Sequence, residues 1–477
     1  MSTFSGLGTA LSSLIAQRQG LEVSGQNIAN ANTVGYTRQR AAMSALPAAT
    51  VPSMFSTNNG VGNGVHVTSI QRLSDAFLDA RVNTESGAAA YLAARATSYA
   101  NLEKTIGEPA TTGLANQLGA MWSAWQDVAN TPSKESSRAV LLETSQQVAD
   151  RLATLYTSAD TQWTQTRTTA VALVDQINTA AKNVADLNER ILAITNSGAA
   201  ANELMDARDQ QITQLATLAG ATTRARDNGQ IDVFVGGNAI VDGASSKELA
   251  VSGAATFGQA TAGGTVSVVW AGTSPAVNAG LDSGRVAGLL SVLAPPGTPA
   301  GSGGALTEAA ATYDAVATQI ATRVNALHGS ATTVGGAPGG DFFTIDPTKP
   351  AALGLKVAIT NPADVAVADP AKGALDGSVA DAIARLGTAT DGPDASWSSA
   401  VVQLGVRTAS LGSRAAVAEA SRSAAASQQL SQASVDTDEE TVNMLAYQRA
   451  YEGAARVMTA IDEMLDTLIN RTGVVGR

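Results

Sequence analysis

The chain has 477 residues, which is long enough for two or three domains with cores of their own. Its 41 acidic and 30 basic side chains give a formal net charge of −11, which opposes binding to nucleic acid or to an anionic membrane, so we expect neither partner. The chain has no cysteine, which excludes disulfides, cysteine-based zinc sites and thiol nucleophiles.

The N-terminal stretch, MSTFSGLGTALSSLIAQRQG, has no basic segment followed by a continuous apolar run. No stretch of ~18 apolar residues occurs anywhere in the chain. We therefore expect a soluble protein without a cleaved signal peptide, which leaves the cell only if another export route recognises it.

An N-terminal helix is predicted by apolar residues that recur at alternating spacings of four and three, as in the seam of a coiled coil. This seam runs through Leu7, Leu11, Leu14, Leu21 and Ile28. We expect it to pack against another helix of the assembly.

The predicted helix leads into an asparagine-rich stretch, NIANANTVGYTRQR, which begins at Asn27. Asparagine is unfavourable inside a helix because its amide competes for backbone hydrogen bonds, so repeated use indicates that the amides have other partners. We expect the helix to continue to Gly35, with Asn27, Asn30 and Asn32 fixing the register against neighbouring copies. A frayed helix end capped by Gly35 is the alternative.

The middle of the chain alternates between helical and extended patterns. Prolines and a glycine cluster between residues 43 and 64, followed by period-two alternation to residue 72, predict a loop and a hairpin. Helical periods then predict helices over 90–106, 133–158 and 165–195, and another over NELMDARDQQITQLATLAG. The segments GQIDVFVGGNAIVDG and TVSVVWAG predict strands, a helix is expected over 306–329, and short strands such as LGLKVAIT follow.

From residue 396 the chain is predicted to be helical to its end. A last helix is expected to begin near Thr437, because Thr437 and Glu440 fit a capping box. Along this helix, apolar side chains again alternate at spacings of four and three. This row comprises Tyr447, Ala454, Val457, Ile461, Met464 and Leu468. Tyr451 lies beside it, in a second row of the same helix.

These patterns predict a mainly α fold with a β-rich insertion, made of coiled-coil terminal helices, a long helical bundle or rod, and a central β-rich outer domain. The terminal coiled-coil assembly domain comprises residues 1–40 and 436–477. The helical rod, with the loop and hairpin, comprises 41–220, 306–330 and 396–435. The β-rich outer region comprises 221–305 and 331–395.

No motif predicts catalysis, a cofactor site or a metal site. The glycines of NNGVGNGVHV lack the spacing of a phosphate loop and indicate a turn. His66 and His328 are the only histidines, too few for a zinc site without cysteine. Asp206 and Asp209 share a helix face, but Arg208 beside them suggests a solvated charged surface. Trp122 and Trp125 are typical of a helix core, so we do not expect an enzyme.

The stretch ANANTVGYTRQR resembles the N-terminal motif of the flagellar rod, hook and hook-associated axial proteins, and the terminal heptads are similar to that family's assembly helices. Four further stretches resemble the members that form the first of two junction layers between hook and filament. These are VGNGVHVTSIQRLSDAFL, ANELMDARDQQITQLATLAG with NGQIDVFVGGNAIVDG, RVNALHGSATTVGGAPGGDFF, and DEETVNMLAYQRAYEGAARVMTAIDEMLDTLINR. The compact β-rich region implies that the additional outer domain of longer members is missing.

The resemblance implies a structural protein that forms a ring-like layer of copies on the hook and templates filament assembly. Its implied partners are other copies, the hook protein, the second junction protein, and a cytoplasmic export chaperone on the C-terminal helix. Export through the flagellar type III apparatus would place it in the flagellum, outside the cell. The implied assembly interface comprises the two terminal rows above, the three asparagines, and Gly35, Tyr36 and Arg38.

Two alternatives stay open. Another axial protein, the hook protein or the second junction protein, would share the terminal motifs. A secreted adhesin or glycan-acting protein would instead place its active part in the central β-rich insertion.

Overall fold

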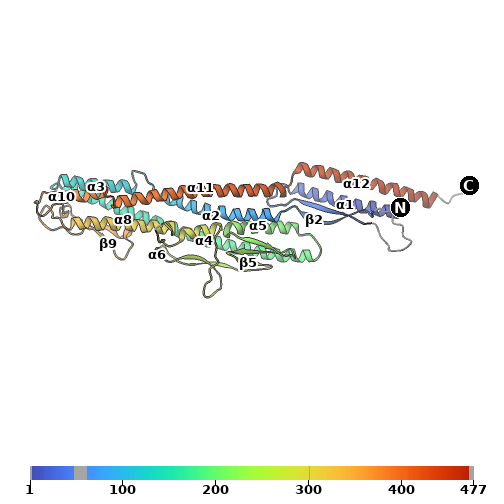
Figure 1. The fold of residues 1–477 in the computed structure, drawn as a ribbon, viewed down its shortest axis with the longest axis horizontal. Coiled ribbons are helices and arrows are strands. Elements are labelled where there is room, and N and C mark those ends of the chain that lie inside the picture. Colours follow the sequence, from blue (N-terminus) through green and yellow to red (C-terminus); the bar gives the residue numbers. More distant parts are fainter. Residues whose placement is uncertain (1–2, 48–61, 300, 472–477) are drawn as a thin grey trace.

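The computed structural model describes residues 3–47, 62–299 and 301–471. Within this part of the chain, the molecule is an elongated rod whose long helices run close to its axis (Figure 1). The first and last long helices lie side by side at one end of the rod (Figure 1). Most of the predicted loop, residues 48–61, lies outside the described residues, as do the outermost parts of both terminal segments.

Six helices build the body of the rod. They are α2 (Ala76–Ile106), α3 (Leu114–Asn130), α4 (Glu135–Asn196), α5 (Asn202–Ala219), α8 (Ala305–His328) and α11 (Pro393–Ala433). The sequence predicted two helices over 133–158 and 165–195, whereas α4 is one continuous helix of 62 residues. The stretch between the two predicted segments contains neither glycine nor proline, so nothing in it interrupts the helix.

The inward faces of these helices bury large apolar side chains. The ring centroids of Trp125 in α3 and Phe342 lie 4.9 Å apart, and Trp163 in α4 is fully buried. Trp122 and Trp125 are 6% and 0% exposed, so the interpretation of this pair as helix core is confirmed. One continuous hydrophobic core therefore runs along the rod.

The β-containing insertion follows α5 and lies along the side of the rod, against α4 (Figure 1). An antiparallel four-stranded sheet comprises β3 (Thr222–Ala225), β4 (Ile231–Val235), β5 (Asn238–Asp242) and β6 (Ser245–Ser246). A separate hairpin of β7 (Leu249–Gly253) and β8 (Val266–Trp270) encloses α6 (Phe257–Thr261), and α7 (Gly284–Leu293) returns the chain to α2. The predicted fold class, mainly α with a β-rich insertion, is confirmed.

Residues 331–395 contain fewer strands than expected. Here β9 (Phe343–Ile345) and β10 (Leu355–Val357) form a two-stranded sheet, α9 (Ala351–Gly354) lies between them, and α10 (Ser378–Ala384) packs on α3. Asn325 of α8 fastens this segment: its amide donates to the Phe343 carbonyl over 2.7 Å and accepts from the Phe342 backbone amide over 3.0 Å. The division of the chain into three domains stays a prediction.

Two helices and a two-stranded hairpin form the opposite end of the molecule. They are α1 (Thr3–Ala29), β1 (Gln39–Ala45), β2 (Val65–Arg72) and α12 (Thr437–Asp466). Helix is not continuous from residue 396 to the end, because residues 434–436 interrupt it between α11 and α12. The N-cap of α12 is Asp436 and not Thr437: its carboxylate accepts from the Asp438 and Glu439 backbone amides over 2.9 and 3.2 Å. None of the described helices combines the length and the apolar character needed to span a membrane.

Candidate assembly surface

Helices α1 and α12 pack against each other in antiparallel orientation. A Cβ atom added at Gly20 would lie 2.8 Å from the Tyr447 ring, and one added at Gly6 would lie 3.1 Å from Ile461 Cδ1. Because the two glycines and their two partners are equally spaced along their helices, in opposite directions, these contacts fix the register of the pair. Glycine lets the helices approach closely at both places.

The predicted apolar rows contribute to this pair only in part. On α12, Ala454 and Ile461 are buried and Tyr447 is half-buried, whereas Val457 and Met464 are 52% and 51% exposed. The other exposed members of the two rows are Leu11, Tyr451 and Leu468. The half-buried members are Leu7, Leu14, Leu21 and Ile28.

The buried side of α1 is made of smaller residues than the predicted leucine seam. Ala10, Ala16, Gly20 and Val23 are buried, whereas no leucine of the seam is. The sequence analysis missed these positions because it followed the largest apolar side chains. From Ala16 to Asn27 the buried positions recur at spacings of four, three and four, and this pattern of smaller residues was the available signal.

The asparagine-rich stretch turns the chain instead of continuing the helix. Helix α1 ends at Ala29, and the Thr33 and Tyr36 backbone amides donate to carbonyls three residues earlier. The prediction of a helix to Gly35 is therefore wrong, because a succession of tight turns replaces it. Gly35 has a φ of +78°, in the left-handed region that favours glycine.

The partners of the most buried amide lie within the chain. Asn27 is 1% exposed; it donates to the Gln39 carbonyl over 2.8 Å and accepts from the Tyr36 hydroxyl over 2.9 Å. The expectation that Asn27 pairs with neighbouring copies is wrong, because all of these contacts order the turn into β1. Asn30 caps the same turn through Gln26 and Thr33, and Asn32 is exposed.

Two arginines at the base of the β1–β2 hairpin connect the terminal helices to the rod. Arg38 reaches Glu440 of α12 over 2.6 Å, and Arg72 reaches Asp206 and Asp209 of α5 over 2.8 and 2.7 Å. The hairpin pairs Gln39 with Arg72, so both arginines leave the same end of the ladder. We call the ion pairs of Arg38 and Arg72 the arginine joint.

Two of the acidic partners in the arginine joint, Glu440 and Asp206, are buried. Glu440 is 2% and Asp206 5% exposed. Burial raises the pKa of Asp206 above its usual value, while the charge of Arg72 and a hydrogen bond from Thr37 act in the opposite direction. The interpretation of Asp206, Arg208 and Asp209 as a solvated charged surface is therefore wrong for Asp206 and Arg208, which are 5% and 4% exposed. Asp209 is half-buried.

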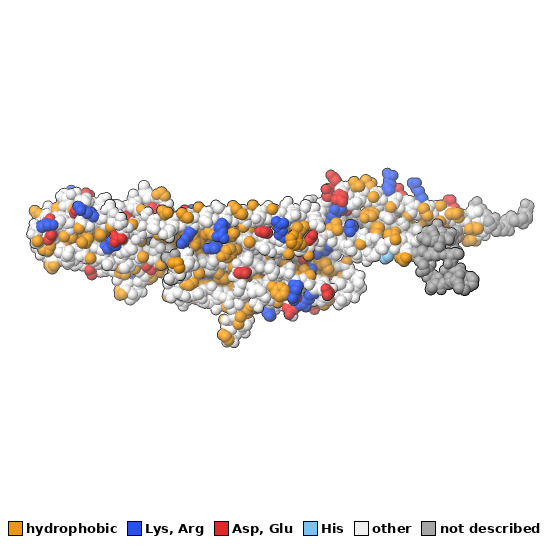
Figure 2. Space-filling view, viewed as in Figure 1, with side chains coloured by type: hydrophobic (Ala, Val, Ile, Leu, Met, Phe, Trp, Pro, Cys, Tyr) orange, Lys and Arg blue, Asp and Glu red, His pale blue; other side chains and the backbone are white. Residues whose placement is uncertain are grey.

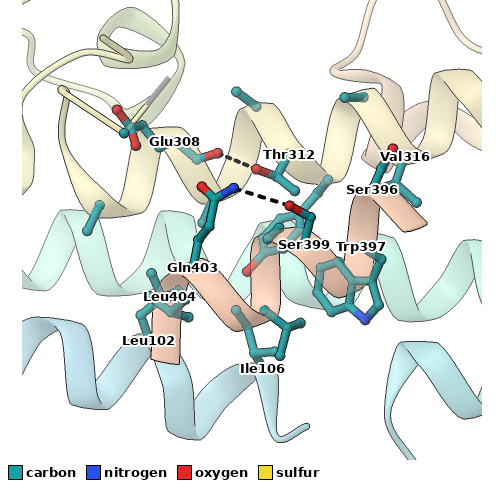
Figure 3. Close-up of a pocket in the computed structure, with 18 of the residues that line it drawn as sticks. Leu102, Ile106, Glu308, Thr312, Val316, Ser396, Trp397, Ser399, Gln403 and Leu404 are labelled. Atoms are coloured by element: carbon teal, nitrogen blue, oxygen red, sulfur yellow. Dashed lines mark hydrogen bonds between the residues drawn. The ribbon is translucent and has the colours of Figure 1, made fainter. Parts of the chain in front are cut away.

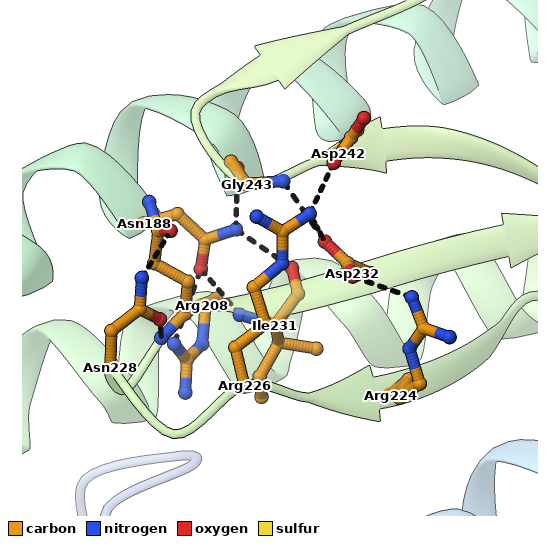
Figure 4. Close-up of polar contacts among 10 residues, drawn as sticks. Asn188, Arg208, Arg224, Arg226, Asn228, Ile231, Asp232, Asp242 and Gly243 are labelled. Atoms are coloured by element: carbon orange, nitrogen blue, oxygen red, sulfur yellow. Dashed lines mark hydrogen bonds and ion pairs between the residues drawn. The ribbon is translucent and has the colours of Figure 1, made fainter.

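Arg208 fastens α5 to the β-containing insertion. It donates to the Gly229 carbonyl over 2.7 Å. It also donates to Asn188 Oδ1 over 3.2 Å (Figure 4). Asn188 in turn donates to the Ile231 and Gly243 carbonyls over 2.8 Å each (Figure 4). Burial lowers the pKa of Arg208. The stretch MDARD thus holds the hairpin on one side and the sheet on the other.

The two histidines occupy different environments. His66 is exposed on β2, whereas His328 is fully buried beside Trp125 and Phe342. Within residues 3–47, 62–299 and 301–471, no three His, Asp or Glu side chains form a group that could hold a metal ion. Of the glycines weighed as a phosphate loop, Gly60 lies outside the described residues.

Three segments of the chain match models of known protein families. Residues 99–343 match the model of the flagellar hook-associated protein FlgK helical domain. Residues 7–37 match the flagella basal body rod protein model, and residues 426–471 match the C-terminal model of the flagellar basal body rod FlgEFG proteins. The two rod matches cover α1 and α12, the helices of the terminal pair.

Individual flagellar proteins are also similar to this chain. The flagellar hook-associated protein 1 of Bacillus subtilis (strain 168) is 29% identical over all of this chain and all of its own length. The protein of the same name from Escherichia coli (strain K12) is 28% identical over 73% of this chain and 61% of its own length. The solved flagellar hook junction protein FlgK from Burkholderia pseudomallei has the same fold, with a TM-score of 0.62 at 16% identity, covering 73% of this chain and 99% of that chain. Because the FlgK model alone matches more than half of the residues, the chain belongs to the flagellar hook-associated protein FlgK family and is a structural component of the bacterial flagellum.

Proposed function

We propose that copies of this chain form the junction layer between hook and filament and provide the surface on which the filament is built. The relatives named flagellar hook-associated protein 1, and the solved protein whose title names the hook junction, support this role. The partners are then other copies, the hook protein and the second junction protein. The layer would lie outside the cell, at the distal end of the hook.

The observation that carries the proposal is an apolar surface that the chain leaves uncovered. On α12, the side chains of Val442, Val457 and Met464 are 65%, 52% and 51% exposed, beside the face that packs on α1. We call these three residues the outer row. Figure 2 shows apolar side chains exposed along the end of the molecule that α12 forms. Burying a side chain of this kind contributes about 2 kcal/mol, so several copies in contact gain substantial stability from the row.

A charge in the outer row tests the proposal. Val457→Asp should leave the melting temperature of the purified protein unchanged, because the side chain is half exposed. In the assembled layer the same carboxylate would be buried without a partner, at a cost of several kcal/mol. We expect a strain that carries only this variant to build hooks, to release flagellin unpolymerised and to lose motility.

The matched control is Val140→Asp, which changes an equally exposed valine near the start of α4. This strain should build normal filaments. Normal filaments in the Val457→Asp strain as well would contradict the role of the outer row. Ile461→Asp is a less informative change, because Ile461 is only 8% exposed and packs on α1, so its loss also weakens the chain's own fold.

The position of the layer needs a separate experiment. A gold-labelled copy of the chain should appear in electron micrographs as a band at the boundary between hook and filament. Gold label along the hook, or only on the filament side of this boundary, would instead indicate another axial protein.

Before assembly, a small cytoplasmic chaperone would cover the same outer row, and the flagellar type III apparatus would export the chain. The chaperone and the neighbouring copies in the layer cannot contact the outer row at the same time, because each would bury Val457 and Met464. Val457→Asp should therefore also abolish co-purification of the chaperone, while Val140→Asp should retain it. Retained co-purification in both variants would place the chaperone elsewhere on the chain.

A further inference from the structure

Helix α11 packs only one of its faces onto the rod. On this inner face, Leu404 lies beside Leu102 of α2 (Figure 3). On the outer face, Val402, Val406 and Val417 are 62%, 65% and 68% exposed. The rod therefore leaves an apolar surface of α11 uncovered.

The outer face of α11 has the spacing of a coiled-coil seam. Exposed residues without charge recur there at strictly alternating spacings of four and three, and Val417 adjoins them. They are Val402, Val406, Ala409, Ser413, Ala416 and Ala420. We call these six residues the α11 seam.

Helix α4 carries a second exposed seam without charge, at spacings of three and four. Its six residues, the α4 seam, are Thr154, Thr157, Thr161, Thr164, Thr168 and Val171. The hydroxyls of Thr154, Thr157 and Thr161 donate to carbonyls four residues earlier, over 2.8, 2.8 and 2.9 Å. Because the helix itself satisfies these hydroxyls, the methyl groups are the part of the side chains left for contact with another molecule.

The α4 seam borders an open hollow of about 490 Å³. Thr105 of α2 lines this hollow together with threonines of the α4 seam, and its lining of Thr, Ser, Ala and Gln side chains carries no charge. The exposed valines of the α11 seam project from the rod, whereas the α4 seam is hollowed. The two surfaces are thus complementary in shape and in polarity.

The two seams lie at the same level of the rod. Gln162 of α4 donates to Thr105 of α2 over 2.7 Å. A Cβ atom added at Gly405 of α11 would lie 3.7 Å from Oε1 of Glu103, two residues earlier in α2. Gln162 and Gly405 are each next to a member of their seam, so the same turn of α2 is level with both seams.

Helices α4 and α11 also run in the same direction. Helix α4 leads into α5, whose Asp206 belongs to the arginine joint, and α11 leads into α12. Both helices therefore run toward the terminal pair. Two copies that stand side by side with their terminal pairs at the same end bring α11 of one copy parallel to α4 of the next, which is the geometry of a parallel coiled coil.

The charges beside the seams favour contact between unlike seams. Arg414 beside the α11 seam and Asp160 beside the α4 seam are both exposed. Two α11 seams in contact would bring two arginines together, and two α4 seams two aspartates, whereas unlike seams bring opposite charges together. Of the other charges nearby, Arg407 is paired with Glu308 and Arg167 donates to the insertion.

The seams are too small to hold two free copies together. A seam of about 18 residues is about 27 Å long on a helix about 10 Å wide, which gives roughly 270 Å² per partner. Stable interfaces bury roughly 800 Å² per partner. The occupant of each seam is therefore a molecule that other contacts also hold in place, as neighbouring copies in a layer are.

We propose that neighbouring copies of this chain contact each other along their rods, with the α11 seam of one copy packed on the α4 seam of the next. Because two different surfaces meet, each copy keeps one free seam of each kind, and the contact continues from copy to copy around a ring or a helical layer. The inference rests on the proposed function, since it requires copies that stand side by side, and it adds the rod surfaces through which they touch.

Introduced cysteines test the contact, because the chain has none of its own. A strain whose only copy carries both Val406→Cys and Thr161→Cys is grown, and its isolated hook–filament structures are treated with a short bismaleimide. We expect a ladder of dimers, trimers and larger oligomers on denaturing gels, and monomer alone from each single-cysteine variant. The purified monomer, in which α2 lies between the two positions, controls for links within one chain.

The matched control pairs Val406→Cys with Val140→Cys, an exposed position of α4 outside its seam, and should give no ladder. A missing ladder from the Val406→Cys and Thr161→Cys pair would overturn the contact. Dimers from either single-cysteine variant would show that like seams meet and would overturn the unlike pairing.

A charge in the α11 seam gives a second measurement. Val406→Asp should leave the melting temperature of the purified protein unchanged, because the side chain is 65% exposed, and should reduce the amount of chain recovered with hooks at least about tenfold. Val140→Asp should be recovered at the wild-type amount, and equal recovery of Val406→Asp would overturn the contact. A gold-labelled band at the hook–filament boundary without a ladder contradicts the seam contact alone, whereas a ladder with label elsewhere contradicts the junction role alone.

Discussion

The rod and the terminal pair are both helical, yet they differ in how they bury their side chains. In the rod, Trp125, Trp163 and Phe342 are fully enclosed by neighbouring elements. Of the 30 residues in α12, only Glu440, Ala454 and Ile461 are buried. The rod thus has the packing of a domain that is stable by its own contacts, whereas the terminal pair has the packing of a surface that other chains complete.

The arginine joint lies where these two regions meet. The ion pairs of Arg72 join it to acids of the rod, and those of Arg38 join it to acids of α12. The hairpin that carries both arginines therefore couples the orientation of the terminal pair to the rod. A joint made of buried ion pairs depends on geometry more than a joint made of apolar contacts does, because each charge needs its partner in place.

The largest expected effect concerns the rod core. Trp163→Ala removes a fully buried ring that lies 6.0 Å from the Phe257 ring and whose indole donates to the Leu293 carbonyl. We predict a loss of about 3–5 kcal/mol in the free energy of unfolding by denaturant. Val457→Ala, in the outer row, should cost less than about 0.5 kcal/mol. Similar losses in both variants would contradict the contrast between the two regions.

The next effect concerns the arginine joint. Arg72→Met keeps most of the side-chain volume but leaves the buried Asp206 carboxylate without its counter-charge. We predict a loss of about 3 kcal/mol in the free energy of unfolding. Lys182→Met, which removes an exposed ion pair on α4, is the control and should change stability by less than about 0.5 kcal/mol. If both variants unfold like the wild type, the joint does not hold the terminal pair to the rod.

Much of the rod was predictable because its pattern is local. Apolar spacing located α5 and α8 nearly to their ends, and the fusion of two predicted helices into α4 followed from the absence of a breaker. The short strands near residue 355 were less predictable, since side chains of α8 and not an extended sheet hold that segment. Periodicity reports local preference, and tertiary contacts decide the rest.

The candidate assembly surface was only partly predictable. Val457 and Met464 of the outer row belonged to the predicted apolar stripe, whereas Val442 did not. The partners of Asn27 and Asp206 could not be predicted, because each is set by a contact with an element distant in the chain or beyond a turn. The sequence indicated that the amides need partners, and the sequence analysis expected these partners to be other copies of the chain. A single sequence contains no signal that distinguishes an intrachain partner from a neighbouring chain.

A smaller and local effect is expected within the terminal pair. Ile461→Ala removes a side chain that fills the space beside Gly6, so the α1–α12 contact should weaken by about 2 kcal/mol. Amide exchange in the C-terminal half of α12 should then accelerate about 30-fold, while exchange in α4 stays unchanged. Leu11→Ala, which truncates an exposed side chain of α1, should change neither rate. Equal acceleration in α4 would show that the two regions unfold as one unit.

The smallest effect is a pH dependence confined to the rod. The His328 Nε2 atom accepts from the Ala366 backbone amide over 2.9 Å, and Nδ1 lies 2.7 Å from the Gly340 carbonyl, so the ring is neutral with its proton on Nδ1. Burial lowers the pKa of His328 below its ordinary value of 6.5, although the nearby Asp341 carboxylate acts in the opposite direction. A second proton on the ring would face the Ala366 amide and break that hydrogen bond.

The sign of the effect follows from proton binding. Below about pH 6.5 the unfolded chain binds a proton at this histidine more readily than the folded chain, so the free energy of unfolding falls as the pH falls. We predict a loss of about 1 kcal/mol between about pH 7.5 and about pH 5.5. The protection factor of the Ala366 amide, which corrects for the slower intrinsic exchange at lower pH, should fall over the same interval, while protection factors in α12, which lacks histidine, should not. His66→Ala is the matched control, because His66 is exposed on β2, and this variant should retain the full loss. If the loss disappears in His66→Ala, the pH dependence belongs to the hairpin beside the terminal pair and not to the core of the rod.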